Sequence, residues 1–332
     1  MKKENSRIWA SLLILFITFS IFLFREKINS FYLKKLFAFS FSPKRVEKVE
    51  KGGFGVFASF SKEKNLSLSF IDNKKNVIFA QKIKGKWIKE KVAENGLFGT
   101  KTFLAFSKKG TPFILYIDQN FSLNLAQKKG NFWEIEKIHQ NVALTPNLSF
   151  DEKDKPFLSF WDFKKGALFL AKKEKGKWKK ELLDKGKVGW WNSLALRKKF
   201  IYLSYFDFKN KDLLFLFFDS KKWQKETVDF KGDVGRKNSL ILDKKGNVYI
   251  VYLDESLGKI KMALKKEGGW QIEEIDSCFG NFVLRKTEKE EPIVFYYDPK
   301  SKFLKLALFR EGKWQKIKFI FLGKILKKES WT

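Results

Sequence analysis

The chain has 332 residues, 44% of them hydrophobic and 17% aromatic, which is enough to bury a large core in a single domain. Its 68 lysines and arginines outnumber its 37 aspartates and glutamates, and the formal net charge of +31 favours anionic partners over basic ones. A single cysteine, Cys278, excludes an intrachain disulfide, and a single histidine, His139, excludes a multi-histidine metal site.

Residues 8–24 form the first predicted element, an uncharged apolar stretch bracketed by Arg7 and Arg25. Its length lies at the short end of the range for a membrane-spanning helix. No small-x-small cleavage site follows closely, so an uncleaved signal anchor is favoured, and a cleaved signal peptide stays open as the alternative. We predict a short cytoplasmic segment (1–7), a transmembrane anchor (8–24) and a juxtamembrane linker (25–43), with the remainder on the extracytoplasmic side of the cell membrane.

Six copies of one sequence pattern follow, from residue 44 to residue 322. Each copy has a run of alternating apolar residues that ends in aspartate, then a tryptophan 15 or 16 residues later. The aspartates are Asp72, Asp118, Asp162, Asp207, Asp254 and Asp298, and the tryptophans are Trp87, Trp133, Trp178, Trp223, Trp270 and Trp314. A fixed period of this length is typical of solenoids, propellers and repeat arrays.

The fifth copy shows what one unit builds. It contains four short apolar runs, NSLILD, VYIVYLD, KIKMALK and WQIEEID, separated by turn residues at hairpin spacing, which indicates strands. In FIYLSYFD both alternating sets are largely apolar, which is typical of a strand covered on both faces. We therefore predict an all-β fold, a six-bladed β-propeller of four-stranded antiparallel blades over 44–322, with a basic C-terminal tail over 323–332.

The last blade has two candidates for its outer strand. Residues 46–55, VEKVEKGGFG, resemble the outer strand and linker KELLDKGKVG at 180–189, as though the N-terminal segment completed the ring. Residues 314–321, WQKIKFIF, supply a C-terminal candidate. The sequence does not choose between them.

The repeat unit, exemplified by SLALR, FIYLSYFD, LLFLFF and KKW, resembles the repeats of extracytoplasmic propellers related to sialidase-like and BNR-type families. This resemblance covers residues 44–321 and implies the fold. Sialidases need an arginine cluster, a tyrosine/glutamate pair and Asp boxes, whereas the turns here read KIKGKW and KEKGKW. Six-bladed lectins, which pair Trp, Glu and Arg between blades, are a closer analogy. Five units place a glutamate three residues after the tryptophan, with no recurring arginine: Glu90, Glu136, Glu181, Glu226 and Glu273.

Function is expected where the sixfold pattern breaks. Trp190 and Trp191 stand together in KVGWWNS, which we place in a linker at the channel mouth, where the rings could stack on sugars or anchor a protein. Arg236 occupies the matching position of the next unit, and Arg285 falls in an innermost strand where other units place small or aliphatic residues. We predict these four as ligand-binding residues, with packing within the blades as the alternative.

The remaining chemistry-bearing residues favour structural roles. His139 sits where other units have aspartate and is predicted to be an outer-strand residue. The repeated aspartates are predicted to close turns rather than to form a calcium site, because aspartate readily accepts backbone N–H bonds in turns. We predict no catalytic residue, no metal and no cofactor.

Two functions follow. The first is a membrane-anchored, non-enzymatic binding or scaffolding module for a protein partner or an anionic surface glycan. The second is a glycan-cleaving enzyme, for which the carboxylates of Asp207 and Asp254 are available. A monomeric domain is expected, and nucleic acid is disfavoured because the predicted compartment lacks it. A lysine-rich compositional bias, without any anionic partner, is the alternative explanation of the positive charge.

Overall fold

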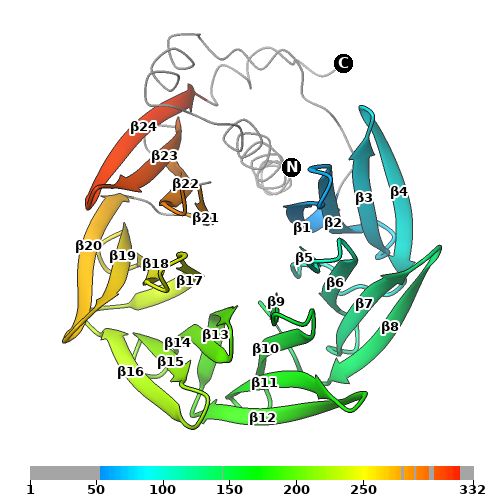
Figure 1. Cartoon of the computed structure of the whole chain (residues 1–332), viewed down its shortest axis with the longest axis horizontal. Coiled ribbons are helices and arrows are strands. Elements are labelled where there is room, and N and C mark those ends of the chain that lie inside the picture. Colours follow the sequence, from blue (N-terminus) through cyan, green and yellow to red (C-terminus); the bar gives the residue numbers. More distant parts are fainter. Residues whose placement is uncertain (1–52, 144, 278–279, 288, 299–302, 322–332) are drawn as a thin grey trace.

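The computed structural model describes residues 53–321, apart from 144, 278–279, 288 and 299–302. Within them, six four-stranded antiparallel sheets are arranged around a central axis, which confirms the predicted six-bladed propeller (Figure 1). No helix among these residues is long and apolar enough to cross a membrane. The predicted segments 1–7, 8–24, 25–43 and 323–332 lie outside the described residues, so they stay predictions.

Each blade uses four consecutive strands, with the first innermost and the fourth outermost (Figure 1). Blades 1 and 2 contain β1 (Gly53–Phe60), β2 (Leu66–Asp72), β3 (Val77–Ile83), β4 (Lys86–Ala93), β5 (Phe103–Phe106), β6 (Pro112–Ile117), β7 (Leu123–Lys129) and β8 (Phe132–His139). Blades 3 and 4 contain β9 (Asn147–Phe150), β10 (Pro156–Asp162), β11 (Ala167–Glu174), β12 (Lys177–Lys185), β13 (Val188–Arg197), β14 (Phe200–Asp207), β15 (Asp212–Phe218) and β16 (Trp223–Asp229). Blades 5 and 6 contain β17 (Val234–Leu242), β18 (Val248–Asp254), β19 (Lys259–Lys266), β20 (Gly269–Ser277), β21 (Phe282–Lys286), β22 (Pro292–Asp298), β23 (Phe303–Arg310) and β24 (Lys313–Phe321).

The C-terminal candidate supplies the outer strand of the last blade. Strand β24 pairs with β23 in blade 6, and β1 pairs with β2 in blade 1. Each described blade is thus built from its own stretch of chain, and residues 46–52 of the N-terminal candidate lie outside the described residues.

The hydrophobic core lies between blades, as strands covered on both faces require. At the junction of blades 4 and 5, for example, Leu213 and Phe215 pack with Val234, Ile250 and Tyr252 in one buried cluster. Four other junctions, from blade 1 to blade 6, have mixed clusters of the same kind. In these clusters blades 2 to 5 each bury both faces against neighbours, so such a blade cannot hide its apolar surface alone.

Aspartates close the turns between second and third strands. Oδ1 of Asp72 accepts the backbone N–H groups of Lys74 and Asn76, both at 2.8 Å. Asp118 and Asp207 accept backbone N–H groups of their own turns in the same way. These contacts confirm the predicted turn role of the repeated aspartates.

In blades 2 to 5 the repeated tryptophan fastens the blade to the one before it. The indole N–H of Trp178 donates to Glu136 of blade 2 at 3.0 Å, while Lys173 donates to the same carboxylate at 2.7 Å. Equivalent Trp-to-Glu bonds join three further pairs of blades: Trp133 to Glu90 at 2.8 Å, Trp223 to Glu181 at 2.7 Å and Trp270 to Glu226 at 2.8 Å. Because the Lys173 ammonium also lies 5.9 Å from the Trp178 ring centroid, lysine covers the indole face.

A second set of polar contacts joins neighbouring blades. In blade 5 the hydroxyl of Tyr252 donates to Asp229 at 2.6 Å, and Lys261 pairs with Asp254 at 2.6 Å and with Asp229 at 3.6 Å. All four side chains are buried. Blade 6 repeats the arrangement, and its Tyr296 hydroxyl donates to Asp276 at 2.6 Å.

At the junction of blades 2 and 3, a histidine of blade 2 takes the place of the outer-strand aspartate. The Nε2 atom of His139 lies 2.8 Å from Asp162 Oδ2, and its ring lies 4.8 Å from that of Phe160, which stands where blades 5 and 6 have tyrosine. Phe160 has no hydroxyl to donate to a carboxylate, and it packs instead against the imidazole ring of His139. The outer-strand, structural role predicted for His139 is confirmed.

Asp276 should make the junction of blades 5 and 6 sensitive to acid. Burial raises its pKa, but hydrogen bonds from Tyr296, the Ser277 backbone N–H and Lys305 outweigh burial and hold the pKa below its usual 3.8. A lowered folded-state pKa gives stability that is present above the unfolded pKa and lost as pH falls through the folded one. We therefore expect the difference in Tm between wild type and Asp276→Asn to be largest above about pH 5 and to shrink at lower pH. Parallel Tm curves from pH 7 to pH 2 would contradict this assignment.

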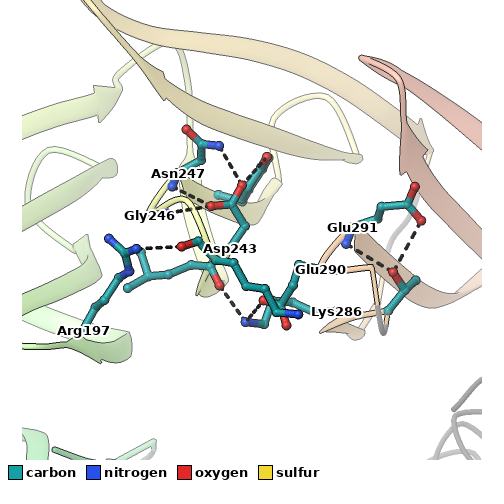
Figure 2. Close-up of polar contacts among 11 residues, drawn as sticks. Arg197, Asp243, Gly246, Asn247, Lys286, Glu290 and Glu291 are labelled. Carbon is teal, nitrogen blue, oxygen red and sulfur yellow. Dashed lines mark hydrogen bonds and ion pairs between the residues drawn. The ribbon is translucent and has the colours of Figure 1, made fainter. Parts of the chain in front are cut away.

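Turns on one face of the ring also hold neighbouring blades together (Figure 2). Nη2 of Arg197 in blade 4 donates to the backbone oxygen of Lys244 in blade 5 at 2.6 Å, and Lys286 Nζ of blade 6 donates to the Leu242 oxygen at 2.7 Å. We call this the turn face, since it carries the turns between first and second strands. The linker face lies opposite and carries the turns between second and third strands together with the blade-to-blade linkers.

Candidate functional site

The predicted tryptophan pair lies at the linker-face end of blade 4. Trp190 and Trp191 belong to the first residues of β13 and not to a linker, which corrects the sequence-based placement. Strand β13 bulges here, because its pairing with β14 shifts on both sides of Trp190. Gly189 starts the bulge with φ +103°, and Asn192 closes it by donating to the Gly189 oxygen at 3.1 Å.

The bulge forces Trp191 into a left-handed conformation with φ +44°, an unusual value for a bulky residue. Lys237 occupies the same place in the bulge of blade 5 with φ +51°, so the conformation belongs to the repeat. Only the side chain differs between the two blades. Blade 4 therefore has a large aromatic residue in a strained backbone conformation. Such strain is often found at functional sites.

Seven aromatic rings from blades 2, 3 and 4 form a chain of contacts on the linker face, which we call the aromatic strip. Trp190 is its centre, with ring centroids 4.7 Å from Trp161, 4.8 Å from Phe208 and 5.6 Å from Trp191. The strip comprises Phe121, Trp161, Phe163, Trp190, Trp191, Phe206 and Phe208. The tryptophans are half-buried, whereas Phe121 and Phe208 are each 42% exposed.

Arg236 ends the strip on the blade 5 side. Its guanidinium lies 5.7 Å from the Trp191 ring and 5.1 Å from the Phe206 ring, within cation–π range. Two hydrogen bonds to Asp233, at 2.7 and 2.9 Å, fix its orientation. The hydrogen bond to Asp233 raises the pKa of Arg236. The structure thus brings three of the four predicted residues together: Trp190, Trp191 and Arg236.

Arg285 lies apart from this cluster, in the innermost strand of blade 6. Nη1 donates to the backbone oxygen of Leu284 at 2.8 Å, and burial lowers its pKa. No described residue of the aromatic strip contacts it. The position needs a partner or water, as expected for an arginine so near the axis, but it does not form one site with the tryptophans.

Two lysines near the axis were missed by the sequence analysis. Lys101 and Lys237 occupy equivalent positions in blades 2 and 5, and the pKa of Lys101 is lowered by burial and by the charge of Lys237. Lys237 directly follows Arg236, so positive charge adjoins the strip. Both lysines occupy the repeat position that Trp191 fills in blade 4. A comparison of that position across the units would have identified them.

Two phenylalanines of the strip were also missed, although they break the repeat. Phe163 and Phe208 directly follow the turn aspartates Asp162 and Asp207, where other units have asparagine, glutamine, glutamate or proline. The same search for departures from symmetry that identified Trp190 would have found them.

Two indole N–H groups of the strip, those of Trp161 and Trp190, are buried and have no hydrogen-bond acceptor among the described residues. Unpaired buried donors are rare in folded proteins, because they lose their bonds to water. Both nitrogen atoms are shielded from solvent, so an acceptor on a ligand reaches them only after the rings move. The strip thus contains unused hydrogen-bonding capacity.

The carboxylates proposed for a hydrolase have structural partners. Asp207 accepts the backbone N–H of Lys209 at 2.8 Å, and Asp254, which is fully buried, pairs with Lys261. Among the described residues, no group of three or more His, Cys, Asp and Glu side chains is placed to hold a metal ion.

Neither a protein-family model nor a curated protein sequence matches this chain. Solved structures show the fold. A fucose-specific lectin from Aleuria aurantia, at 14% identity and a TM-score of 0.55, covers 80% of this chain and 94% of its own. AofleA from Arthrobotrys oligospora (14%, 0.55) covers 85% and 92%, and SapL1 lectin in complex with alpha methyl fucoside (13%, 0.54) covers 80% and 96%. These similarities support the propeller fold alone, while the relation to sialidase-like families stays a prediction.

Proposed function

We propose that this protein is a non-enzymatic glycan-binding propeller, held at the cell membrane on its extracytoplasmic side, and that the aromatic strip binds the sugar. The observation that carries the proposal is the position of Trp191, between the ring of Trp190 and the guanidinium of Arg236. Aromatic faces present flat apolar area to a sugar ring, and a fixed guanidinium donates hydrogen bonds. Together they form a polar and aromatic surface of the kind that recognises carbohydrates.

An acidic glycan fits this surface better than a neutral one. Lys237 adjoins Arg236, and Lys101 is close enough to Lys237 for their charges to interact. The chain as a whole is strongly basic, which raises the local concentration of anionic ligands. The structurally similar lectins, described with fucosides, support the choice of a glycan because they share the fold. The Trp–Glu contacts between blades are not offered as the sugar site, since the Glu136 carboxylate is already occupied by Trp178 and Lys173.

Membrane attachment rests on the apolar stretch 8–24 and its flanking arginines. A protease-protection assay on intact cells or spheroplasts tests it, with the propeller expected to be cleaved from outside. Propeller protected from external protease would contradict the extracytoplasmic placement.

Trp191→Gly is expected to weaken glycan binding by about 30-fold, equivalent to ~2 kcal/mol, as for a typical hot-spot residue. Glycine accepts the positive φ of this position, so the variant removes the ring without straining the backbone. The measurement is titration of the full-length protein with hits from an array of neutral and acidic glycans.

Trp178→Phe is the matched control. It alters one of the repeated tryptophans, which bonds to the preceding blade and lies outside the aromatic strip. It should leave the glycan affinity unchanged. Equal binding by Trp191→Gly and wild type would remove the strip as the site, and the absence of any glycan hit would remove the proposed function.

A further inference from the structure

Exposed apolar side chains gather on the linker face. Five described loops of this face each carry one large, exposed hydrophobic residue: Phe98, Phe121, Phe208, Phe230 and Leu257. Phe230 is 66% exposed and Leu257 is 56% exposed. The loops belong to blades 2, 4 and 5 and to the linkers from blade 1 to 2 and from blade 4 to 5, so these side chains are spread around the ring and not stacked in one pocket. The other large hydrophobic residues that are exposed, Ile88, Phe132, Ile135, Leu182 and Ile272, lie on outer strands. Among the described loops, exposed large hydrophobic residues thus belong to the linker face, which makes it the candidate interaction face.

The loops of the linker face also carry positive charge. Their exposed lysines include Lys74, Lys75, Lys164, Lys165, Lys187, Lys209, Lys211 and Lys231, of which the last three lie in loops with an exposed hydrophobic residue. Of the acidic residues there, Glu94 pairs with Lys91 at 2.7 Å, Asp233 pairs with Arg236, and Glu255 is exposed. The turn face carries exposed lysines as well, among them Lys108, Lys109, Lys198, Lys199, Lys244 and Lys245, so charge alone does not distinguish the two faces. Within the described loops, large exposed hydrophobic side chains join the lysines on the linker face.

The chain enters the propeller at this same face. Gly53, the first residue of β1, pairs with Asp72, which begins a linker-face turn. The preceding residues include the apolar stretch 8–24, separated from Gly53 by residues 25–52. A membrane anchor attached here places the linker face, and not the turn face, at the end of the propeller that joins the anchor.

We propose that the linker face docks on an anionic lipid bilayer, with Phe230 and Leu257 entering the interfacial region and the loop lysines binding headgroup phosphates. Aromatic and aliphatic side chains favour the membrane interface, and each lysine near an anionic surface strengthens binding by about fivefold. The proposal does not depend on glycan binding. If both hold, the bound sugar is carried by a component of the membrane itself, because the strip faces the bilayer.

Site-directed spin labels on the full-length protein in bilayers test this orientation. Single cysteines replace residues on a Cys278→Ser background: Phe230→Cys and Leu257→Cys on the linker face, with Phe132→Cys and Leu182→Cys as controls. The controls match in exposure, at 64% and 52%, but lie on outer strands. In bilayers of phosphatidylcholine with phosphatidylglycerol, collisions of the labels at 230 and 257 with a water-soluble nickel complex should fall at least about twofold, while those at 132 and 182 stay unchanged.

A charge control separates docking from tethering. Replacing Lys74, Lys164, Lys209 and Lys231 with glutamine should abolish the shielding, whereas the same change at Lys62, Lys153, Lys198 and Lys244 on the turn face should preserve it. Pure phosphatidylcholine bilayers should give little shielding. Equal nickel collisions at all four labels in anionic bilayers, or shielding of 132 and 182, would overturn the proposal. A glycan-binding result for Trp191→Gly leaves this outcome untouched, so the two proposals fail separately.

Discussion

Replacing Lys261 with methionine is expected to lower the free energy of unfolding by about 3–5 kcal/mol, because it leaves a buried carboxylate without its counter-charge. Asp254 is fully buried and pairs with Lys261 at 2.6 Å, while Asp229 lies 3.6 Å from the same ammonium. Hydrogen bonds to Asp254 and the charges of Asp229 and Asp254 raise the pKa of Lys261, overcoming the opposing effect of its burial. The ammonium is therefore held in its charged form between two acids.

Lys265→Met is the matched control, since it makes the same change in the same strand. Lys265 pairs with Glu226, but both side chains are 32% exposed, so water can replace the lost partner. The cost should be about 1 kcal/mol or less. Urea unfolding of the two variants measures the difference. Equal midpoints would show that burial of the Lys261 ion pairs does not increase the loss of unfolding free energy.

The propeller could be predicted because its determinants repeat. Each unit must cover both faces of a sheet, so an apolar run such as FIYLSYFD and an aspartate that closes a turn recur in every blade. Six observations of one pattern remove the ambiguity that a single short apolar run would leave between strand and helix. The sequence shows a glutamate three residues after the tryptophan in five units, but its bond to the tryptophan of the next blade was not predicted. The paired lysines Lys128, Lys173 and Lys265 were missed as well, although they stand five residues before their tryptophans.

The binding site was harder to predict because it depends on contacts between different units. The repeat spacing placed Trp190, Trp191 and Arg236 at one end of neighbouring blades. It did not predict that Trp161 of blade 3 packs against Trp190. That contact depends on how two sheets twist past each other, which a period in the sequence does not encode. Arg285, a break in symmetry near the axis, lies apart from the aromatic strip, and its predicted ligand-binding role stays a prediction.

Gly189→Ala is expected to cost about 3 kcal/mol, since it combines an unfavourable φ with a steric overlap. The residue has φ +103°, and an added Cβ would lie 2.8 Å from Cβ of the buried Leu168 in blade 3. Relief of the overlap must push β13 away from blade 3, and Trp190 would then lose its contact with Trp161.

The comparison variant is Gly176→Ala, whose φ is +79° but whose added Cβ meets no atom within 4 Å. It carries backbone strain without overlap, and about 1 kcal/mol is expected. Thermal unfolding gives the two costs, and tryptophan fluorescence and glycan titration report the strip. Because the glycine fixes the distance between blades 3 and 4, Gly189→Ala should change both readouts, whereas Gly176→Ala should change neither. A Gly189→Ala protein with native fluorescence and affinity would show that the aromatic strip does not depend on this close approach of the two blades.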